Sequence, residues 1–490
     1  MIKRLLLTFL GFVLLNGALW AEKIVVFHTS DTHGFYYPKE DEKGNTTGGF
    51  AALKSLVGKE KLPHLLLDSG DFLTDTLETK ATKGLSSVQL MNAVGYNATT
   101  IGNHEFDFGD QRLLDVLPEF KFPVLAANIE MLPGSYTKNY LKEILPYKIF
   151  NTGKIKIAVI GIARAGVNHN MVKVTSAVSA IKKYLPEIEK QKPDFVIVLI
   201  HESVVPFKGK SINEIIAEQF DGRINLVLGG HMHRVIQNRK EGSVYIVESG
   251  HGLRGVSRIE IDTDTKAVKS QYINLDISKT GEDAAVKKLA ESIRVKDKDT
   301  FITKSADLIT KEPAQKTGCD DAPLVNFFAD ILKESQKTDI GIFNVFGIRA
   351  DIFPGAVLER DIYEAVPFNE NIYKITANGN FIKRFLISGV KQDRNIYAYS
   401  GLTAEYKIKN GKVKNVKIFI NGEPLSNTKN YTIAVNSFIV KGRATAWMFD
   451  RLEEGAVQDT GKLARDIFIA ELKKQAQISA PDSCRTERKK

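Results

Sequence analysis

The sequence predicts an α/β protein, and three observations lead to this class. Short apolar runs such as "KIVVF" and "DFVIVLI" have the composition of strands buried on both faces. Amphipathic stretches such as "FAALKSLVGKE" lie between these runs, from residue 21 to about residue 276. The runs are followed at once by His, Asp or Asn. Strands that alternate with helices predict a layered α/β domain.

The length of the chain predicts two or three domains. It has 490 residues, of which 43% are apolar and 26% are charged. We expect a first domain over residues 22–276, a linking helix over 277–302, a second domain of mixed strands and helices over 303–478, and a disordered polar tail over 479–490. The net charge is +10, but Lys and Arg are scattered among Asp and Glu. We therefore expect no nucleic-acid polymer as a partner.

The first residues have the pattern of an export signal. Two basic residues at positions 3 and 4 precede an apolar run from Leu5 to Trp20, and "GALWA" provides a cleavage site after Ala21. The alternative is a single membrane anchor, but the run is short for a span of ~20 residues. We expect removal of residues 1–21, no stable membrane anchor and a periplasmic location.

The exported chain would enter an oxidising compartment with two cysteines, Cys319 and Cys484. They either form a disulfide or remain two separate thiols, and the sequence leaves both open.

Polar side chains with metal-binding chemistry follow five predicted strands. In parallel sheets the carboxyl ends of the strands share one edge, where ligands bind. A two-residue spacing in an extended segment places both side chains on one side. Any one of these residues alone would be an ordinary loop residue, but together they predict a metal site. The five groups are Asp31 and His33; Asp68 and Asp71; Asn103, His104 and Asp107; His201; and His231 and His233.

The densest of these groups is "IGNHEFDFG", which places Asn103, His104, Glu105 and Asp107 within five residues. Asn103 offers a carbonyl oxygen to a metal, and His104 beside it can face a substrate. Asp107 can hold the His104 imidazole, fixing its tautomer and favouring its protonated form.

The motifs "HTSDTHG", "LDSGD", "MNAVGYNATTIGNHEFDFG", "HES" and "GGHMH" occur in this order between Ile24 and about Ile261. This pattern resembles the 5'-nucleotidase family of calcineurin-like metallophosphoesterases. The resemblance implies a four-layer sandwich, with helices flanking two sheets, followed by a smaller α/β C-terminal domain. Ser30 and Glu202 depart from the family pattern, and neither is a ligand position.

Carried over by position, the resemblance implies a two-metal hydrolase. The metals would be Zn, Mn, Fe or Co, because all the ligands are oxygens or imidazoles. Metal-activated water would attack phosphorus, and His104 with Asp107 would form a catalytic dyad. One metal would take Asp31, His33 and His233, the other would take Asn103, His201 and His231, and Asp71 would bridge them.

The second half resembles the family less closely. "NVFGIRADI" suggests Asn344 and Arg349 as substrate contacts, and Arg suits phosphate because its planar fork binds two oxygens. Phe368 and Phe438 occupy positions where the family sandwiches a nucleobase. The alternatives are core packing for the two phenylalanines and a structural ion pair for Arg349.

The stretch "KGRATAW" departs from the family, which has a ribose-contacting Asp where Ala444 stands. Lys441 and Arg443 lie in the same stretch. We expect poorer discrimination for ribose and a preference for substrates with an additional anionic group, with Arg443 as a candidate contact. Side chains that point into solvent are the alternative.

The leading hypothesis is an exported phosphoesterase that acts on a small-molecule nucleotide or a related anionic substrate. A second hypothesis keeps the metals and changes the ester, as in relatives of this fold that release sulfate from a thiol. A third is a binding protein without turnover, although every expected ligand and His104 are present.

Overall fold

The computed structural model describes residues 23–40, 44–132, 143–164, 171–203, 209–311, 319, 321–391, 394–409, 412–442, 445–481 and 484–489. The expected export signal lies outside these residues. Within them, no helix is both long and apolar enough to span a membrane.

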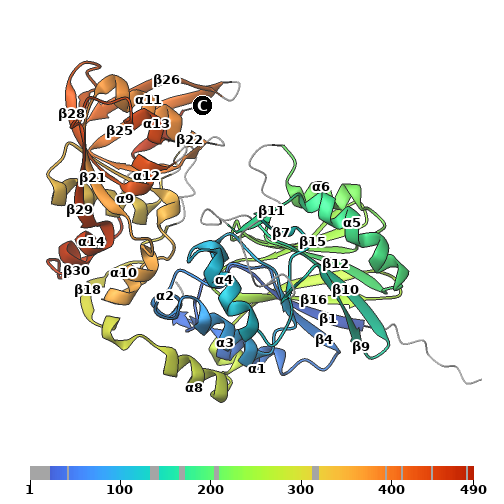
Figure 1. The fold of residues 1–490 in the computed structure, drawn as a ribbon. Coiled ribbons are helices and arrows are strands. Elements are labelled where there is room, and N and C mark those ends of the chain that lie inside the picture. Colours follow the sequence, from blue (N-terminus) through green and yellow to red (C-terminus); the bar gives the residue numbers. More distant parts are fainter. Residues whose placement is uncertain are drawn as a thin grey trace, which may run out of the picture.

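The first domain contains two large sheets (Figure 1). In the first sheet, β1, β4, β5, β6 and β8 run parallel. Strand β16 pairs antiparallel with β1, and β17 pairs antiparallel with β16. Its strands are, in spatial order, β17 (Val268–Asn274), β16 (Gly255–Asp262), β1 (Lys23–Thr29), β4 (His64–Asp68), β5 (Ala98–Thr99), β6 (Val124–Leu125) and β8 (Ile144–Leu145).

The second sheet is parallel in its centre and antiparallel at both edges. Every residue of its central strand, "FVIVLI", is buried, as expected for a strand covered on both faces. The spatial order is β14 (Val235–Glu241), β15 (Val244–Ser249), β13 (Leu226–Gly229), β12 (Phe195–Ile200), β10 (Ile155–Ile162) and β9 (Tyr147–Thr152).

The two sheets pack face to face, and helices cover their outer faces. Ile24 and Leu67 of the first sheet share one core with Val159 and Ile197 of the second. This arrangement confirms the four-layer α/β fold. The outer face of the first sheet is covered by α1 (Phe50–Val57), α3 (Leu85–Val94) and α4 (Asp110–Val116), and that of the second by α5 (Ala177–Lys190) and α6 (Ile212–Gln219).

The segment expected to be one linking helix is divided into two. Helix α7 (Ile277–Thr280) ends at Gly281, whose φ is 68°, and α8 (Ala284–Ile293) follows. Val286 and Ala290 of α8 belong to the same core as α1 and α3. This helix is therefore part of the first domain and not a free connector.

The second domain begins with β18, and its described residues form three sheets of three or more strands and one two-stranded sheet of β22 (Val390–Lys391) and β23 (Arg394–Asn395). The spatial order of the five-stranded sheet is β24 (Tyr397–Ser400), β19 (Ile340–Asn344), β28 (Asn430–Asn436), β21 (Asn371–Asn378) and β29 (Val457–Leu463). That of the four-stranded sheet is β27 (Glu423–Pro424), β26 (Lys412–Ile420), β25 (Leu402–Lys409) and β31 (Thr486–Arg488). That of the three-stranded sheet is β20 (Gly355–Leu358), β18 (Phe301–Ser305) and β30 (Gln477–Ile478). Helices α9 (Pro323–Gln336), α10 (Glu359–Ala365), α11 (Gly379–Gly389), α12 (Ser437–Lys441), α13 (Ala446–Phe449) and α14 (Ala464–Leu472) accompany them.

The expectation of a disordered tail is wrong for its described residues. Strand β31 pairs in parallel with β25, and Thr486 is fully buried. Asp321 accepts a hydrogen bond from the Thr486 hydroxyl at 2.6 Å, and Cys484 forms a disulfide with Cys319. Hydrogen bonds and a disulfide hold this segment in place. Its sequence contains few apolar residues, so the sequence pattern did not predict a strand.

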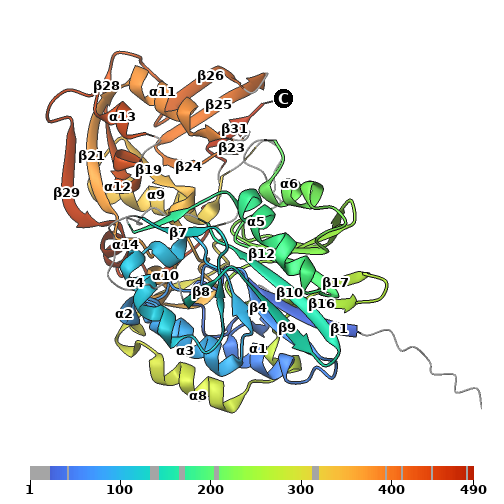
Figure 2. The ribbon, with the colours of Figure 1, turned by 45° about the vertical axis from the view of Figure 1, so that its right-hand side comes forward.

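Charged side chains join the two domains. Figure 2 shows α10 beside α2 (Leu77–Thr82). Arg360 on α10 lies 3.2 Å from Glu78 on α2, and Lys80 on α2 donates to the carbonyl of Pro367. These contacts bring the second domain over the carboxyl ends of the strands of the first.

Candidate metal centre

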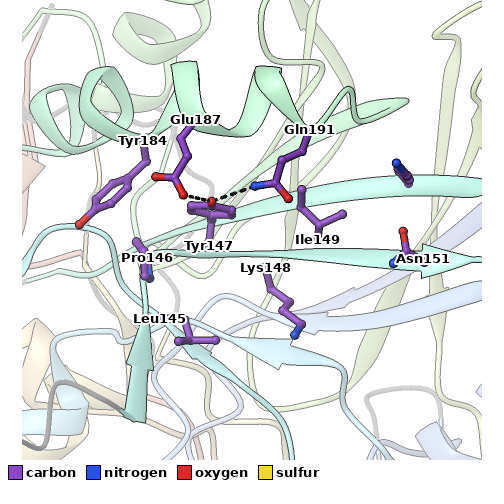
Figure 3. A pocket seen from close by; sticks show the side chains of 10 residues that line it. Leu145, Pro146, Tyr147, Lys148, Ile149, Asn151, Tyr184, Glu187 and Gln191 are labelled. Atoms are coloured by element: carbon purple, nitrogen blue, oxygen red, sulfur yellow. Dashed lines mark hydrogen bonds between the residues drawn. The ribbon is translucent and has the colours of Figure 1, made fainter.

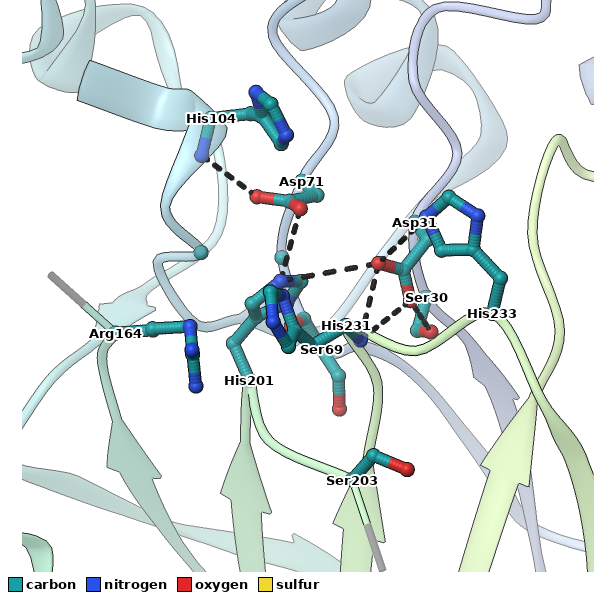
Figure 4. A network of polar contacts seen from close by, with 12 residues as sticks. Ser30, Asp31, Ser69, Asp71, His104, Arg164, His201, Ser203, His231 and His233 are labelled. Atoms are coloured by element: carbon teal, nitrogen blue, oxygen red, sulfur yellow. Dashed lines mark hydrogen bonds and ion pairs between the residues drawn. The ribbon is translucent and has the colours of Figure 1, made fainter. Parts of the chain in front are cut away.

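The expected ligands converge at one edge of both sheets (Figure 4). Asp31 and His33 follow β1, and Asp71 follows β4, in the first sheet. His201 follows β12 and His231 follows β13, in the second sheet. Because the sheets are packed face to face, both sets of strand ends open onto the same space.

The ligand atoms form two groups. In the first group, His33 Nε2 lies 3.1 Å from His233 Nε2, which lies 3.6 Å from Asp31 Oδ1. In the second, His201 Nε2 lies 2.9 Å from Asp71 Oδ2, and His231 completes the group. Within each group all the ligand atoms lie within 4.8 Å of one another. This spacing is suited to one cation per group.

The backbone of the centre is strained. Non-glycine residues rarely adopt a left-handed backbone, because it costs about 1–2 kcal/mol per residue. Such strain persists where the surrounding structure enforces it, and it is concentrated at functional sites. Five of the seven expected ligands adopt it, namely Asp31 (φ 51°), His33 (φ 49°), Asp71 (φ 61°), His231 (φ 77°) and His233 (φ 58°).

Glu105 holds the strained loop around Asp71. Its buried carboxylate accepts hydrogen bonds from the backbone N–H groups of Asp71 at 2.8 Å and Gly102 at 2.6 Å, and also from Phe72 and Leu73. Charge-assisted bonds of this kind are stronger than neutral ones. Glu105 therefore ties the loop after β4 to the loop after β5.

The donor set fits divalent cations. The side-chain oxygen of Asn103 is buried and has no hydrogen-bond partner among the described residues. Burial lowers the pKa of His201, but the negative charges of Asp71 and Asp31 outweigh it and raise that pKa to about 10. The same carboxylates that stabilise an imidazolium would stabilise a cation between them. Oxygen and imidazole donors without thiolate suit Zn, Mn, Fe or Co.

His104 and Asp107 form the expected pair beside the ligands. His104 Nδ1 lies 2.7 Å from Asp107 Oδ2. Burial lowers the pKa of His104, but Asp71 and the bond to Asp107 raise it to about 9. The two carboxylates therefore favour the protonated form of His104. Its backbone N–H also donates to Asp71 at 2.8 Å, which links the pair to the metal centre.

Arg349 reaches the centre from the second domain. Its Nε lies 3.0 Å from Asp75 Oδ2, and its Nη2 lies 3.0 Å from His33 Nε2. The same Asp75 oxygen lies 3.0 Å from His33 Nδ1. Arg349 thus makes the ion pair considered as its alternative role, and the pair lies at the edge of the ligand set.

The other expected substrate residues differ in their placement. Phe368 lies beside His104, with ring centroids 6.4 Å apart, and Phe438 is 53% exposed, so neither is a core residue. Asn344 is buried and accepts from Asn436 at 2.7 Å, so it is fixed inside the second domain. Arg443 lies outside the described residues, as does Ala444.

Two family models match the chain. Residues 24–235 match "Calcineurin-like phosphoesterase", and residues 301–451 match "5'-nucleotidase, C-terminal domain". The order of the two matches is the order of the two domains.

The chain belongs to the 5'-nucleotidase family of calcineurin-like phosphoesterases.

Curated relatives of this chain include longer proteins. It is 24% identical to endonuclease YhcR of Bacillus subtilis over 84% of this chain and 37% of that protein. It is 26% identical to the trifunctional nucleotide phosphoesterase protein YfkN of the same organism, over 95% of this chain and 35% of that protein. The chain thus spans little more than a third of either relative.

Solved structures of the family share the fold. The 5'-nucleotidase precursor of Thermus thermophilus has a TM-score of 0.79 at 23% identity, covering 95% of this chain and 99% of that chain. The sulfate thiohydrolase SoxB of Thermus thermophilus, solved with glycerol, has a TM-score of 0.76 at 16% identity, covering 95% of this chain and 96% of that chain. At these identities the likeness concerns architecture.

Another groove lies away from the ligands. It has a volume of about 670 Å³ and runs between β9 and α5 (Figure 3). Tyr147 donates to Glu187 at 2.6 Å and accepts from Gln191 at 3.0 Å along its wall. None of its lining residues is an expected ligand, so its size does not identify it as the reaction site.

Three functional candidates were not predicted from the sequence. Asp75 contacts both His33 and Arg349, Glu105 holds the Asp71 loop, and the His251 ring stacks on His233 with centroids 4.5 Å apart. Glu105 lies inside "GNHEFD", where the dense cluster was a visible signal. Asp75 and His251 had no comparable signal, because their partners are distant in sequence.

Proposed function

We propose that this chain is an exported dinuclear-metal hydrolase that cleaves phosphate esters of nucleotides. The observation that carries the proposal is the pair of ligand groups at one sheet edge with the His104–Asp107 pair beside them. Asp31, His33 and His233 would hold one cation, Asn103, His201 and His231 would hold the other, and Asp71 would bridge them. When bound, such a metal pair supplies Lewis-acid polarisation and a water of lowered pKa.

In this proposal His104 is the acid of the reaction. Its charge, favoured by the contact with Asp107, would stabilise negative charge on the phosphoryl oxygens, and its proton would go to the leaving oxygen. Asp107 fixes the tautomer by accepting from Nδ1, which leaves Nε2–H for the substrate.

Groups of the second domain would orient the substrate. Arg349 is already aimed at the centre, and its fork suits the two oxygens of a phosphate. Phe368 and the exposed Phe438 provide aromatic faces for a base. Nucleotides carry both a phosphate and a flat ring, so they match these groups.

The proposal is tested by a release assay on purified protein loaded with Mn, Zn or Co. The panel contains mono-, di- and cyclic nucleotides, p-nitrophenyl phosphate, sulfur-oxyanion thiol conjugates and single-stranded DNA. We expect phosphate release from mononucleotides or dinucleotides. Sulfate release without phosphate release would favour the thiohydrolase alternative, DNA cleavage would contradict the expectation of small substrates, and no turnover with any metal would favour a binding protein.

The proposed export has its own support and its own test. The Cys319–Cys484 disulfide suits an oxidising compartment. Mass spectrometry of protein from the exporting cell should give a chain that starts at residue 22. A chain that retains residue 1 would contradict removal of the signal.

A further inference from the structure

A second cavity lies directly beside the metal centre, between the two domains. One wall contains His251, which stacks on His233, and another contains Arg349, which contacts His33. The cavity has a volume of about 20 Å³, enough for one water molecule. Its walls come from both domains and include the long side chains of Lys39, Arg254 and Lys311, whose rotation would make room for a larger group.

The lining is rich in positive charge. It contains Lys39, Arg254, Lys311 and Arg349, with Asp351 as the acid among its described lining residues. Asp351 accepts from the backbone N–H of Lys311 at 2.8 Å, so its charge is turned toward that backbone. Positive groups from two domains repel each other when the domains meet, unless an anion lies between them.

Arg254 differs from Lys39 and Arg349, the lining cations that form ion pairs. Lys39 pairs with Glu364, and Arg349 pairs with Asp75. Arg254 lies over the ring of Phe353 at 5.0 Å, and within the described part of the chain no carboxylate forms an ion pair with it. A guanidinium held against an aromatic ring keeps its planar fork available for an oxyanion.

The ring of His251 lies between this cavity and the proposed ligand His233, on which it stacks. The cavity is therefore separated from the metal centre by one aromatic ring.

We propose that this cavity binds a second anionic group of the substrate, with Arg254 and Lys311 as the residues that select it. This inference rests on the proposed function, because the first anionic group is the phosphate at the metal centre. The ligand is a nucleotide with two phosphate groups, either a diphosphate or a bisphosphate with one phosphate on the sugar. It would join the domains by placing negative charge among cations from both.

The experiment measures kcat/KM of the metal-loaded enzyme for p-nitrophenyl phosphate, AMP, ADP and adenosine 3',5'-bisphosphate. We expect a preference for ADP or the bisphosphate, and the better of the two identifies where the second phosphate lies. Arg254→Met should lower kcat/KM for that substrate about ten- to a hundredfold, mainly through KM, as expected for a lost charge-assisted hydrogen bond. Arg254→Lys should restore part of it, and p-nitrophenyl phosphate should change less than twofold.

The matched control is Arg223→Met, which removes a surface guanidinium that pairs with Glu189 far from the cavity. It should leave all four substrates unchanged. Equal effects of Arg254→Met on AMP and on the doubly phosphorylated substrates would overturn the inference while leaving the proposed function intact.

A second measurement is independent of turnover. Sulfate should raise the Tm of the metal-loaded wild type and of Arg223→Met more than that of Arg254→Met. The same rise in all three proteins would overturn the anion site. If no phosphate ester is hydrolysed, the proposed function fails on the first assay, and the sulfate result still decides whether this cavity binds an anion.

Discussion

The metal centre and the substrate side of the second domain are built in different ways. The centre uses side chains at fixed positions after parallel strands, and strained backbone holds five of them. The proposed substrate side uses Arg349 and Phe368, which contact Asp75 and His104 of the first domain, and the exposed Phe438. The proposed reaction groups therefore lie on rigid elements of the first domain. The proposed substrate-binding groups lie in the second domain, and their position depends on contact between the domains.

The largest effect should come from the bridging position. Asp71→Asn replaces the carboxylate that would lie between the two proposed cations by a neutral amide, so both metals should bind more weakly and turnover should fall below detection. Elemental analysis after dialysis measures the metal content. The control Asp115→Asn alters an exposed acid on α4 and should retain both metals. Retention of one metal at unchanged affinity would show that Asp71 does not bridge.

His104→Ala tests whether His104 takes part in the reaction without binding a metal. Metal content should remain near two per chain, while kcat falls by about 10²- to 10⁴-fold, the usual contribution of a positioned proton donor. Asp107→Asn should cause a smaller loss, because the imidazole keeps its place but loses its charged partner. A loss of metal from His104→Ala would instead make His104 a ligand.

Phe438→Ala tests the proposed recognition of the base by the second domain. Base stacking contributes about 1–3 kcal/mol, so KM for nucleotides should rise about five- to a hundredfold while p-nitrophenyl phosphate is unaffected. The control is Phe301→Ala, because Phe301 is 52% exposed and Phe438 is 53% exposed. If both variants behave alike, Phe438 does not contact the base.

The smallest effect concerns His28, which lies beneath the centre. Burial lowers its pKa from 6.5 to about 3, and its nitrogens contact Ser249 and Ser69 at 2.6 and 2.8 Å. Below pH 6.5 the unfolded chain binds a proton that the folded chain does not, so the free energy of unfolding should fall as the pH falls toward 3. The slope from this one group approaches about 1.4 kcal/mol per pH unit.

Urea unfolding at pH 5, 6 and 7 measures this slope, and His28→Gln should remove it. Subtracting the slope of His28→Gln from that of the wild type removes the contributions of the other histidines and of metal release, because both proteins share them. Parallel slopes would mean that His28 takes up its proton without unfolding.

The sequence predicted most of the fold and of the metal centre, because both depend on local patterns. Apolar runs followed by Asp31, His201 or His231 revealed where parallel strands end, and parallel strands end together. The roles of those ligands stay predictions. The first domain extends past the expected limit at residue 276, because α8 packs into its core.

What the sequence did not reveal depends on contacts between distant residues. The β31 strand is held by Asp321 and a disulfide across 165 residues, and neither has an apolar signature. Arg254 became notable only when the second domain brought Lys311 beside it. Lys441, which lies in the same stretch as Arg443, places its ammonium 5.3 Å from the ring of Tyr373, which is distant in the sequence.

The strained ligands also set a limit for anyone who engineers this protein for heat resistance. Glycine adopts a left-handed backbone without penalty, so in backbone terms alone it would gain about 1–2 kcal/mol at each of these positions. A selection that rewards survival on heating, without rewarding turnover, would therefore favour changes at Asp31, Asp71 or His231 that destroy the centre. Stability and metal binding make opposite demands on the same residues, and a library must keep all five strained ligands unchanged.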